Sequence, residues 1–153
     1  MQADGFEEQL GRLMTEFGQG RTMVLSTAEN GKVSSRMMSV VRLGRLFYFQ
    51  TDTQLRKYAQ LRQNPRAALC TDNIQLEGLC EETGRPLENE AFCEAFKACF
   101  PGSFKAYSAL ENERLFAFRP LFIERWVYKE QIPYLETYDL PARQYAAERY
   151  SGR

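Results

Sequence analysis

The stretch TMVLSTAENGKVSSRMMSVVRLGRLFYFQT, residues 22–51, decides the fold. It contains three runs of β-prone residues, at 22–27, 33–42 and 46–51. The first two runs are separated by Asn30-Gly31, and an Asn-Gly pair between β-prone runs is a strong hairpin signal. Gly44 provides the second turn. Because strands joined by such short turns pair as antiparallel neighbours, the stretch predicts a three-stranded meander.

The segments on either side of the meander predict helices and further strands. Apolar residues at helical spacing predict a helix over residues 6–17. Further helices are expected at 54–63 and 88–100, and further strands at 66–72, 74–82, 114–118 and 121–128. Pro120 is expected at a bulge or edge position between the last two strands. A short helix is expected around residues 142–149 of the tail, 132–153. Short strands with a few helices predict a mainly β (α+β) barrel with helical covers.

Length and charge exclude several classes of protein. The chain has 153 residues, so residues 1–153 are expected to form a single domain. Lys plus Arg equals Asp plus Glu, 20 of each, so the chain has no global field that would attract nucleic acid or an anionic membrane. No apolar run approaches the ~20 residues of a membrane helix, and residues 1–8 do not resemble a secretory signal. These features predict a cytoplasmic protein in which any anion site is a local cluster.

The cysteine and histidine content limits the possible chemistry. The four cysteines have no C-x-x-C spacing, and the chain has no histidine, so no metal site is expected and the cysteines are interpreted as buried free thiols. Without histidine, Ser-His-Asp and Cys-His catalysis are impossible. The glycines form neither a dinucleotide-binding nor a P-loop motif. Chemistry must therefore rest on carboxylates, Tyr, Lys, Cys or a cofactor.

The junction between the third strand and the next helix carries an unusual charge pattern. Asp52 or Thr53 is the expected N-cap, which places Arg56 and Lys57 in or near the first helical turn. Cations there oppose the helix dipole and cost ~0.3–1 kcal/mol when exposed. A helix N-terminus offers N–H groups to a phosphate, so the pair indicates a bound anion. The alternative is that both side chains project into solvent.

Arg36 lies in the second strand, and strand alternation puts it on one face with Met38 and Val40. It is either an outward-facing solubilising residue or part of a site. If the third strand pairs with the second, Thr51 can bring the start of the helix close to Arg36. Three cations could then converge on one anion.

The order of these motifs resembles the FMN-binding split-barrel family typified by pyridoxamine 5'-phosphate oxidase. The resemblance runs from Val24 to Pro65 and continues more weakly to Trp126. It is carried by the segments Ser26-Thr27, Asn30-Gly31, Ser35-Arg36-Met37-Met38, Phe47-Tyr48-Phe49-Gln50-Thr51, Arg56-Lys57 and Asn64-Pro65. It implies a six-stranded antiparallel split β-barrel that forms a homodimer with FMN at the subunit interface.

The resemblance also implies roles for individual residues. Arg36, Arg56 and Lys57 match the residues that hold the FMN phosphate, and Thr51 matches a position near the phosphate and ribityl chain. Met37, Met38 and Ser39 match residues that run along the flavin ring.

Two departures separate the chain from the oxidase itself. Leu55 stands where family members often carry Ser, and the chain lacks the C-terminal His that the oxidases use for substrate. Related members bind a deazaflavin or haem; the Arg-Lys pair favours FMN, and the absence of His removes the commonest haem ligand. The expected function is FMN-dependent oxidation or reduction of a small molecule, with an unassigned substrate and electron donor. A non-catalytic flavin-binding, storage or sensing protein and a partner-binding barrel without ligand are the alternatives.

Overall fold

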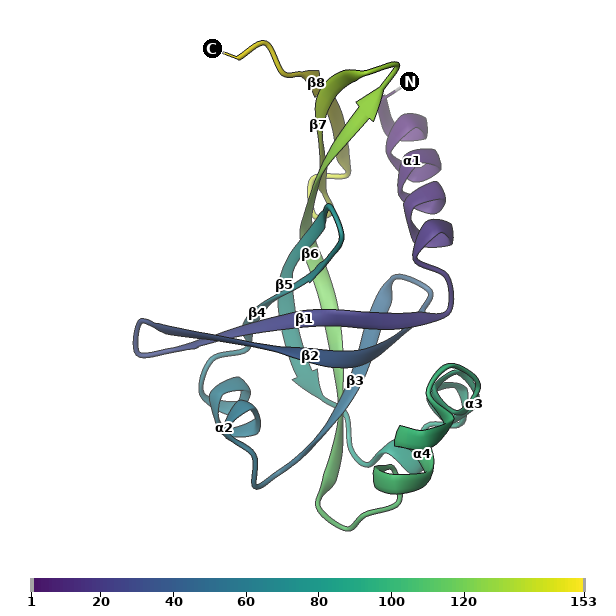
Figure 1. The fold of residues 1–153 in the computed structure, drawn as a ribbon, viewed down its shortest axis with the longest axis vertical. Coiled ribbons are helices and arrows are strands. Elements are labelled where there is room, and N and C mark those ends of the chain that lie inside the picture. The colour runs from purple at the N-terminus through teal and green to yellow at the C-terminus, as the bar shows by residue number, and fades with distance from the viewer. Residues whose placement is uncertain (1, 153) are drawn as a thin grey trace.

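The computed structural model describes residues 2–152 of the chain (Figure 1). Its helices are α1 (Gln2–Phe17), α2 (Arg56–Gln63), α3 (Glu90–Cys99) and α4 (Pro101–Tyr107), with the 3-10 turn η1 (Pro86–Glu88) before α3. Its strands are β1 (Gly20–Glu29), β2 (Lys32–Leu43), β3 (Leu46–Asp52), β4 (Arg66–Thr71), β5 (Ile74–Glu82), β6 (Glu113–Lys129), β7 (Ile132–Asp139) and β8 (Gln144–Arg149). The predicted meander is confirmed as β1, β2 and β3.

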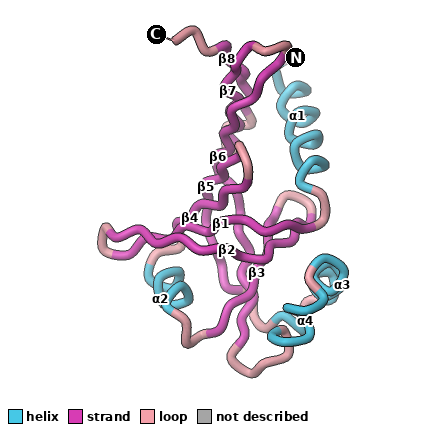
Figure 2. The backbone as a smooth tube through the Cα atoms, viewed as in Figure 1, coloured by secondary structure: helices cyan, strands magenta, loops and turns pink. Residues whose placement is uncertain are grey.

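The first six strands close into an antiparallel barrel. They run in the order β3-β2-β1-β4-β5-β6, and β3 also pairs with β6, from Phe47 opposite Phe118 to Asp52 opposite Glu113. This closure removes the free edges that an open sheet would leave. Figure 2 shows the helices on the outside of these strands. The prediction of a six-stranded antiparallel barrel with flanking helices is confirmed.

Two clusters of buried apolar side chains form the core. The larger fills the barrel and includes Leu25, Phe49 and Phe118, and the apolar stripe of α1 belongs to it. The smaller lies under α3, where Phe92 and Phe96 pack with Val41. Burying a large apolar side chain contributes ~1.5–3 kcal/mol, so the amphipathic helices are held by these faces. The apolar stripe predicted for the helix at 6–17 is therefore confirmed as an inward face, and the helix expected at 88–100 packs on the barrel through Phe92 and Phe96.

Strand β6 corrects one boundary. The sequence predicted two strands on either side of Pro120, whereas β6 runs without a break from Glu113 to Lys129. The pairing with β5 shifts register at Gly78, which lies opposite Pro120. A Cβ atom on Gly78 would lie 2.2 Å from the carbonyl oxygen of Arg119, so strands β5 and β6 approach too closely there for any side chain. Pro120 is tolerated because this irregularity absorbs its missing N–H donor.

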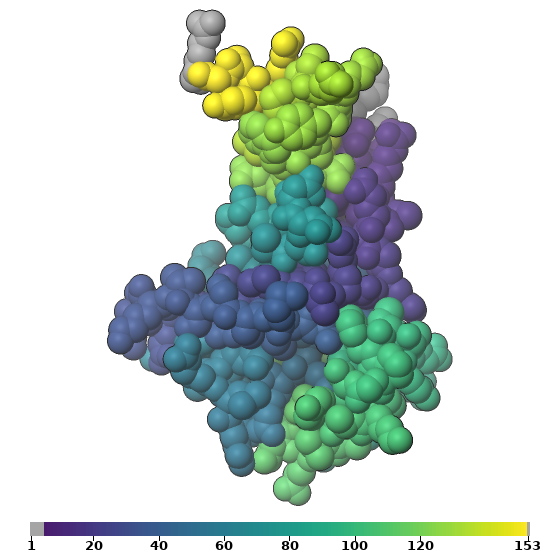
Figure 3. All heavy atoms as spheres, in the orientation of Figure 1, coloured from purple at the N-terminus to yellow at the C-terminus, as the bar shows by residue number. Residues whose placement is uncertain are grey.

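The C-terminal tail also differs from the prediction. The helix expected around residues 142–149 is wrong, because the tail forms the antiparallel hairpin β7–β8. Figures 1 and 3 show this hairpin and α1 together extending the molecule beyond the barrel. The buried carboxylate of Glu136 accepts hydrogen bonds from Arg125 (2.5 Å) and Tyr145 (2.6 Å). Arg125 also pairs with Glu16 of α1 at 2.7 Å, so this network joins the helix to the hairpin. Across residues 2–152, no helix is long and apolar enough to cross a membrane.

Candidate functional site

The site begins where β3 passes into α2. The expected cap at Asp52 or Thr53 is wrong: Leu55 precedes the helix and makes no side-chain cap bond. The Asp52 carboxylate instead accepts a hydrogen bond from the backbone N–H of Gln54 at 2.7 Å, which shapes the turn. Arg56 and Lys57 are the first two residues of α2, as expected, and the first turn contains no acidic residue. The cationic start of this helix is therefore not offset by its own sequence.

Arg36 faces inward from β2, on the same face as Met38 and Val40, so the outward-facing alternative is wrong. Its guanidinium donates hydrogen bonds to Thr27 Oγ1 at 2.9 Å and to Gln60 Oε1 at 3.0 Å. The Gln60 contact joins β2 to α2. The protein thus fixes the orientation of Arg36 through both terminal nitrogens of its guanidinium.

The three cations lie within electrostatic reach of one another. Burial lowers the pKa of Arg36, and the charge of Arg56 lowers it further. Burial also lowers the pKa of Lys57, the charge of Arg36 adds to this effect, and the charge of Glu113 opposes it. Among residues 2–152, none of the three cations has a carboxylate oxygen within ion-pair distance. Their mutual repulsion would be relieved by an anion.

A cavity of about 420 Å³ opens beside these cations, with Met38, Thr51 and Lys57 in its wall. Thr51 is 2% exposed, and its hydroxyl has no hydrogen-bond partner among the described residues. A buried hydroxyl without a partner costs ~1–3 kcal/mol, so a native structure that keeps one has a reason to do so.

The seven residues predicted for the site therefore separate into two groups. Five form one group: Met38, Thr51 and Lys57 line the cavity, and the charges of Arg36 and Arg56 act on this cluster without lining the cavity. Met37 and Ser39 fall on the opposite face of β2, where the Met37 side chain is 63% exposed. These two residues therefore adjoin the inward-facing Arg36 and Met38 only through the backbone of β2.

Two further residues in the cavity wall escaped the sequence analysis. Glu113 is 5% exposed, and burial raises its pKa to about 7, with the charge of Asp52 adding to the effect and Lys57 opposing it. Gln50 is 8% exposed and accepts a hydrogen bond from the Ser108 hydroxyl at 2.8 Å. The local sequence pattern did not indicate either residue as part of the site. Glu113 in particular reaches the junction only because β3 pairs with β6.

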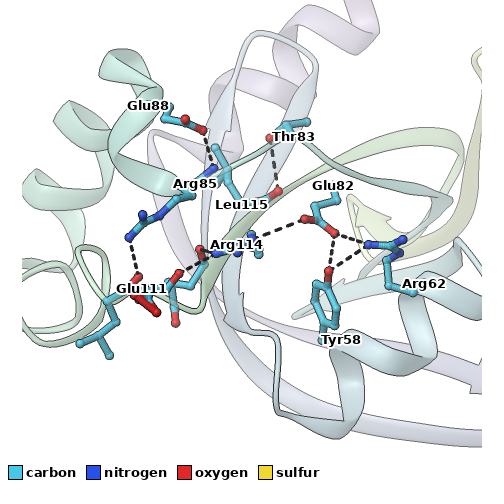
Figure 4. Close-up of polar contacts among 11 residues, drawn as sticks. Tyr58, Arg62, Glu82, Thr83, Arg85, Glu88, Glu111, Arg114 and Leu115 are labelled. Carbon is cyan, nitrogen blue, oxygen red and sulfur yellow. Dashed lines mark hydrogen bonds and ion pairs between the residues drawn. The ribbon is translucent and has the colours of Figure 1, made fainter.

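A polar cluster on the other side of α2 holds the helix in place (Figure 4). Glu82 of β5 accepts hydrogen bonds from Tyr58 at 2.7 Å and from Arg62 at 3.0 Å. Arg114 approaches the same carboxylate at 3.7 Å. Leu61 packs into the barrel core from the same helix. The N-terminus of α2, and with it Arg56 and Lys57, is thus fixed relative to the barrel.

Comparisons with known proteins agree with this architecture. The sequence profile described as pyridoxamine 5'-phosphate oxidase matches residues 12–126. No curated protein sequence matches the chain. Among solved structures, a pyridoxamine 5'-phosphate oxidase-related, FMN-binding protein of Nostoc punctiforme is 18% identical, with a TM-score of 0.59 over 86% of this chain and 88% of that one.

Two other structures share the fold. PhzG of Burkholderia lata, solved with tetrahydrophenazine-1-carboxylic acid, is 16% identical, with a TM-score of 0.65 over 94% of this chain and 91% of that one. HutZ of Vibrio cholerae, a heme storage protein, is 16% identical, with a TM-score of 0.57 over 75% of this chain and 89% of that one. At these identities the likeness concerns the fold alone. The profile, which matches most of the sequence, places the chain in the pyridoxamine 5'-phosphate oxidase family.

Proposed function

We propose that the protein binds flavin mononucleotide, with the phosphate held by Arg36, Arg56 and Lys57. The observation that carries this proposal is a cluster of three cations, none with a carboxylate partner among the described residues, of which Lys57 lines a cavity that also contains Thr51. Arg offers a planar fork to phosphate oxygens and Lys a point charge, so the group suits a phosphate ester. Lys57 is central to the proposal, because its ammonium group makes no hydrogen bond or ion pair among the described residues. Several N–H donors of Arg36, by contrast, already bond other parts of the barrel.

The remaining chemistry of the cavity also fits FMN. In this proposal the Thr51 hydroxyl would bond a phosphate or ribityl oxygen, and Met38 would offer an apolar contact, since both residues line the cavity. The backbone of residues 37–39 would run along the flavin ring. The named heme storage neighbour raises haem as an alternative ligand, but this chain has no histidine, the commonest haem ligand in proteins. Phosphate recognition therefore favours FMN over haem.

We also propose that the protein works as a homodimer with FMN at the subunit interface. Val33 is 73% exposed and Met37 63% exposed, both on β2. A groove of about 330 Å³ beside them is lined by Ala67, Ala68 and Phe122. Exposed apolar side chains beside a partly apolar groove support burial of this face against a second copy. Light scattering with FMN present should give twice the monomer mass of 17.8 kDa, and a monomer would contradict the proposal.

The phosphate site is tested by the double variant Arg56→Ala/Lys57→Ala. Hydrogen bonds to charged groups contribute ~1.5–3 kcal/mol each, and we take the low end because Arg56 is exposed. FMN affinity should therefore fall by about 3 kcal/mol, or roughly 100-fold. Riboflavin lacks the phosphate and should bind the variant and the wild type equally.

The matched control is Arg12→Ala/Lys97→Ala, which removes two exposed cations from α1 and α3. It changes the net charge equally and should leave FMN affinity unchanged. An unchanged FMN titration for the Arg56→Ala/Lys57→Ala variant would refute the assigned phosphate site. Equal loss in both double variants would mean that net charge, rather than a local site, governs binding.

We further propose an oxidoreductase role with a small-molecule substrate. Bound flavin would supply the hydride chemistry, while the protein binds and orients it. The alternative is a non-catalytic protein that stores, carries or senses FMN. Anaerobic mixing of the FMN-loaded protein with NADH or NADPH, followed by a quinone or nitro acceptor, separates the two. Reduction and reoxidation support the enzyme; failure of both favours the binding protein.

A further inference from the structure

Glu113 is a buried carboxyl in the wall of the proposed FMN cavity. It begins β6, opposite Asp52 of β3, and is 5% exposed. The same cavity is lined by Lys57 and by Thr51, whose hydroxyl has no partner among the described residues. A buried carboxylate in a cavity that attracts anions is unexpected, because it would repel the ligand. Its charge state therefore affects what the cavity can bind.

The charged groups around Glu113 come from three elements. Asp52 of β3 is a like charge and raises its pKa, whereas Lys57 of α2 lowers it. Arg114, the next residue of β6, donates to the backbone carbonyl oxygens of Glu111 and Glu113 and directs its charge toward Glu82. Of these groups, Lys57 is the cation that both favours the ionised carboxyl and lies beside Arg36.

We propose that Glu113 is the proton-accepting group of this cavity, so that a ligand carrying a phosphate ester binds together with one proton. The inference rests on the phosphate site proposed above. An incoming phosphate adds negative charge beside Glu113 and engages Lys57, the cation that otherwise stabilises the carboxylate. Both effects favour the neutral carboxyl, which donates a hydrogen bond instead of repelling the ligand.

The direction of the pH dependence follows from linkage. Burial already raises the pKa of Glu113 to about 7 in the free protein, and a bound phosphate raises it further. Affinity is then full at pH values below 7 and falls as the pH rises through 7 toward the pKa of the complex. A neighbouring like charge shifts a carboxyl by about one unit or more, so the loss from this group is roughly tenfold.

The test measures FMN affinity between pH 6 and 8.5 for the wild type, Glu113→Gln and Glu111→Gln. Glu111 is exposed and lies two residues away, so its variant carries the same change in net charge. The wild type and Glu111→Gln should lose about tenfold more affinity over this range than Glu113→Gln. Comparison among the variants cancels the titration of the FMN phosphate itself. Equal pH profiles for all three proteins would overturn the proposal.

Two measurements on the wild type keep the inference separate from the proposed function. Calorimetry in two buffers of different ionisation enthalpy should show uptake of about half a proton or more per FMN at pH 8. Infrared difference titration of the ligand-free protein should show a carboxylic acid band that disappears near pH 7 and is missing in Glu113→Gln. If FMN binds without these signals, the proton coupling is wrong and the proposed function stands. If FMN does not bind, the proposed function fails, and the infrared titration is repeated with inorganic phosphate in place of FMN. A carboxylic acid band that persists to higher pH with phosphate present supports the proton coupling. A band whose midpoint does not move refutes the coupling.

Discussion

Replacement of Thr51 by Val should change stability and ligand affinity in opposite directions. The Thr51 side chain is 2% exposed and its hydroxyl has no partner among the described residues, so the free protein carries the cost of burying it. That cost is ~1–3 kcal/mol, and Val removes it while keeping the branched shape. We expect the ligand-free variant to be more stable by about 1 kcal/mol, which raises Tm by about 2–4 °C for a chain of this length.

The same variant should bind FMN more weakly. A neutral hydrogen bond contributes ~0.5–1.5 kcal/mol, so loss of the hydroxyl should cost roughly 3- to 10-fold in affinity. Thermal unfolding without ligand and an FMN titration measure the two effects. A lower Tm together with weaker binding would indicate general damage and would refute the reasoning. Unchanged affinity would show that the ligand does not use Thr51.

Thr27→Val is the matched control for the stability measurement. Thr27 is 1% exposed, but its hydroxyl donates to Gln60 Oε1 at 2.6 Å and accepts from Arg36 at 2.9 Å. The same substitution there removes both of these hydrogen bonds from the buried network of Thr27, Gln60 and Arg36, so the ligand-free protein should lose about 1–3 kcal/mol. The two valines should therefore shift Tm in opposite directions, which a general effect of Val in a strand would not produce.

Two further predictions concern stability. Gly78→Ala should destabilise the fold by several kcal/mol in urea unfolding, since the new Cβ would lie 2.2 Å from the Arg119 carbonyl oxygen. Gly11→Ala, with open space around it in α1, should instead stabilise the fold by about 0.5–1 kcal/mol. Equal effects of the two substitutions would contradict the clash at Gly78. Burial acts to raise the pKa of Glu136, but hydrogen bonds from Tyr145 and Arg125 outweigh it and hold the pKa below its ordinary value. The stability advantage of the wild type over Glu136→Gln should be full above pH ~4.3 and decline as the pH falls further, and a constant difference in acid would show that the carboxylate is not the source.

The sequence predicted the parts of the fold that depend on local chemistry. Asn30 and Gly31 both adopt positive φ, 52° and 79°, which is the conformation that the Asn-Gly hairpin signal implies. The predictions were wrong where contacts with residues distant in the sequence decide the local structure. The bulge expected at Pro120 is present opposite Gly78, but β6 continues through it instead of dividing into two strands. In the tail, Ala and Glu residues favoured a helix, yet pairing with β7 and the Tyr145–Glu136 hydrogen bond override that local preference.

The candidate site divides in the same way. Arg56 and Lys57 could be found because cations at the start of a helix are locally unusual, and Arg36 because it stands among apolar strand residues. Glu113 could not be found, since a carboxylate at the start of a strand ordinarily faces solvent. Its burial and its proximity to Lys57 exist only because β3 closes the barrel against β6.

The central claim is that the chain binds FMN, and an absorption spectrum tests it most directly. The purified wild-type protein is incubated with excess FMN, separated from free ligand by gel filtration, and its spectrum is recorded. We expect a yellow protein that retains about one FMN per chain, because each chain supplies one set of Arg36, Arg56 and Lys57. A colourless protein that fails to take up FMN would contradict it.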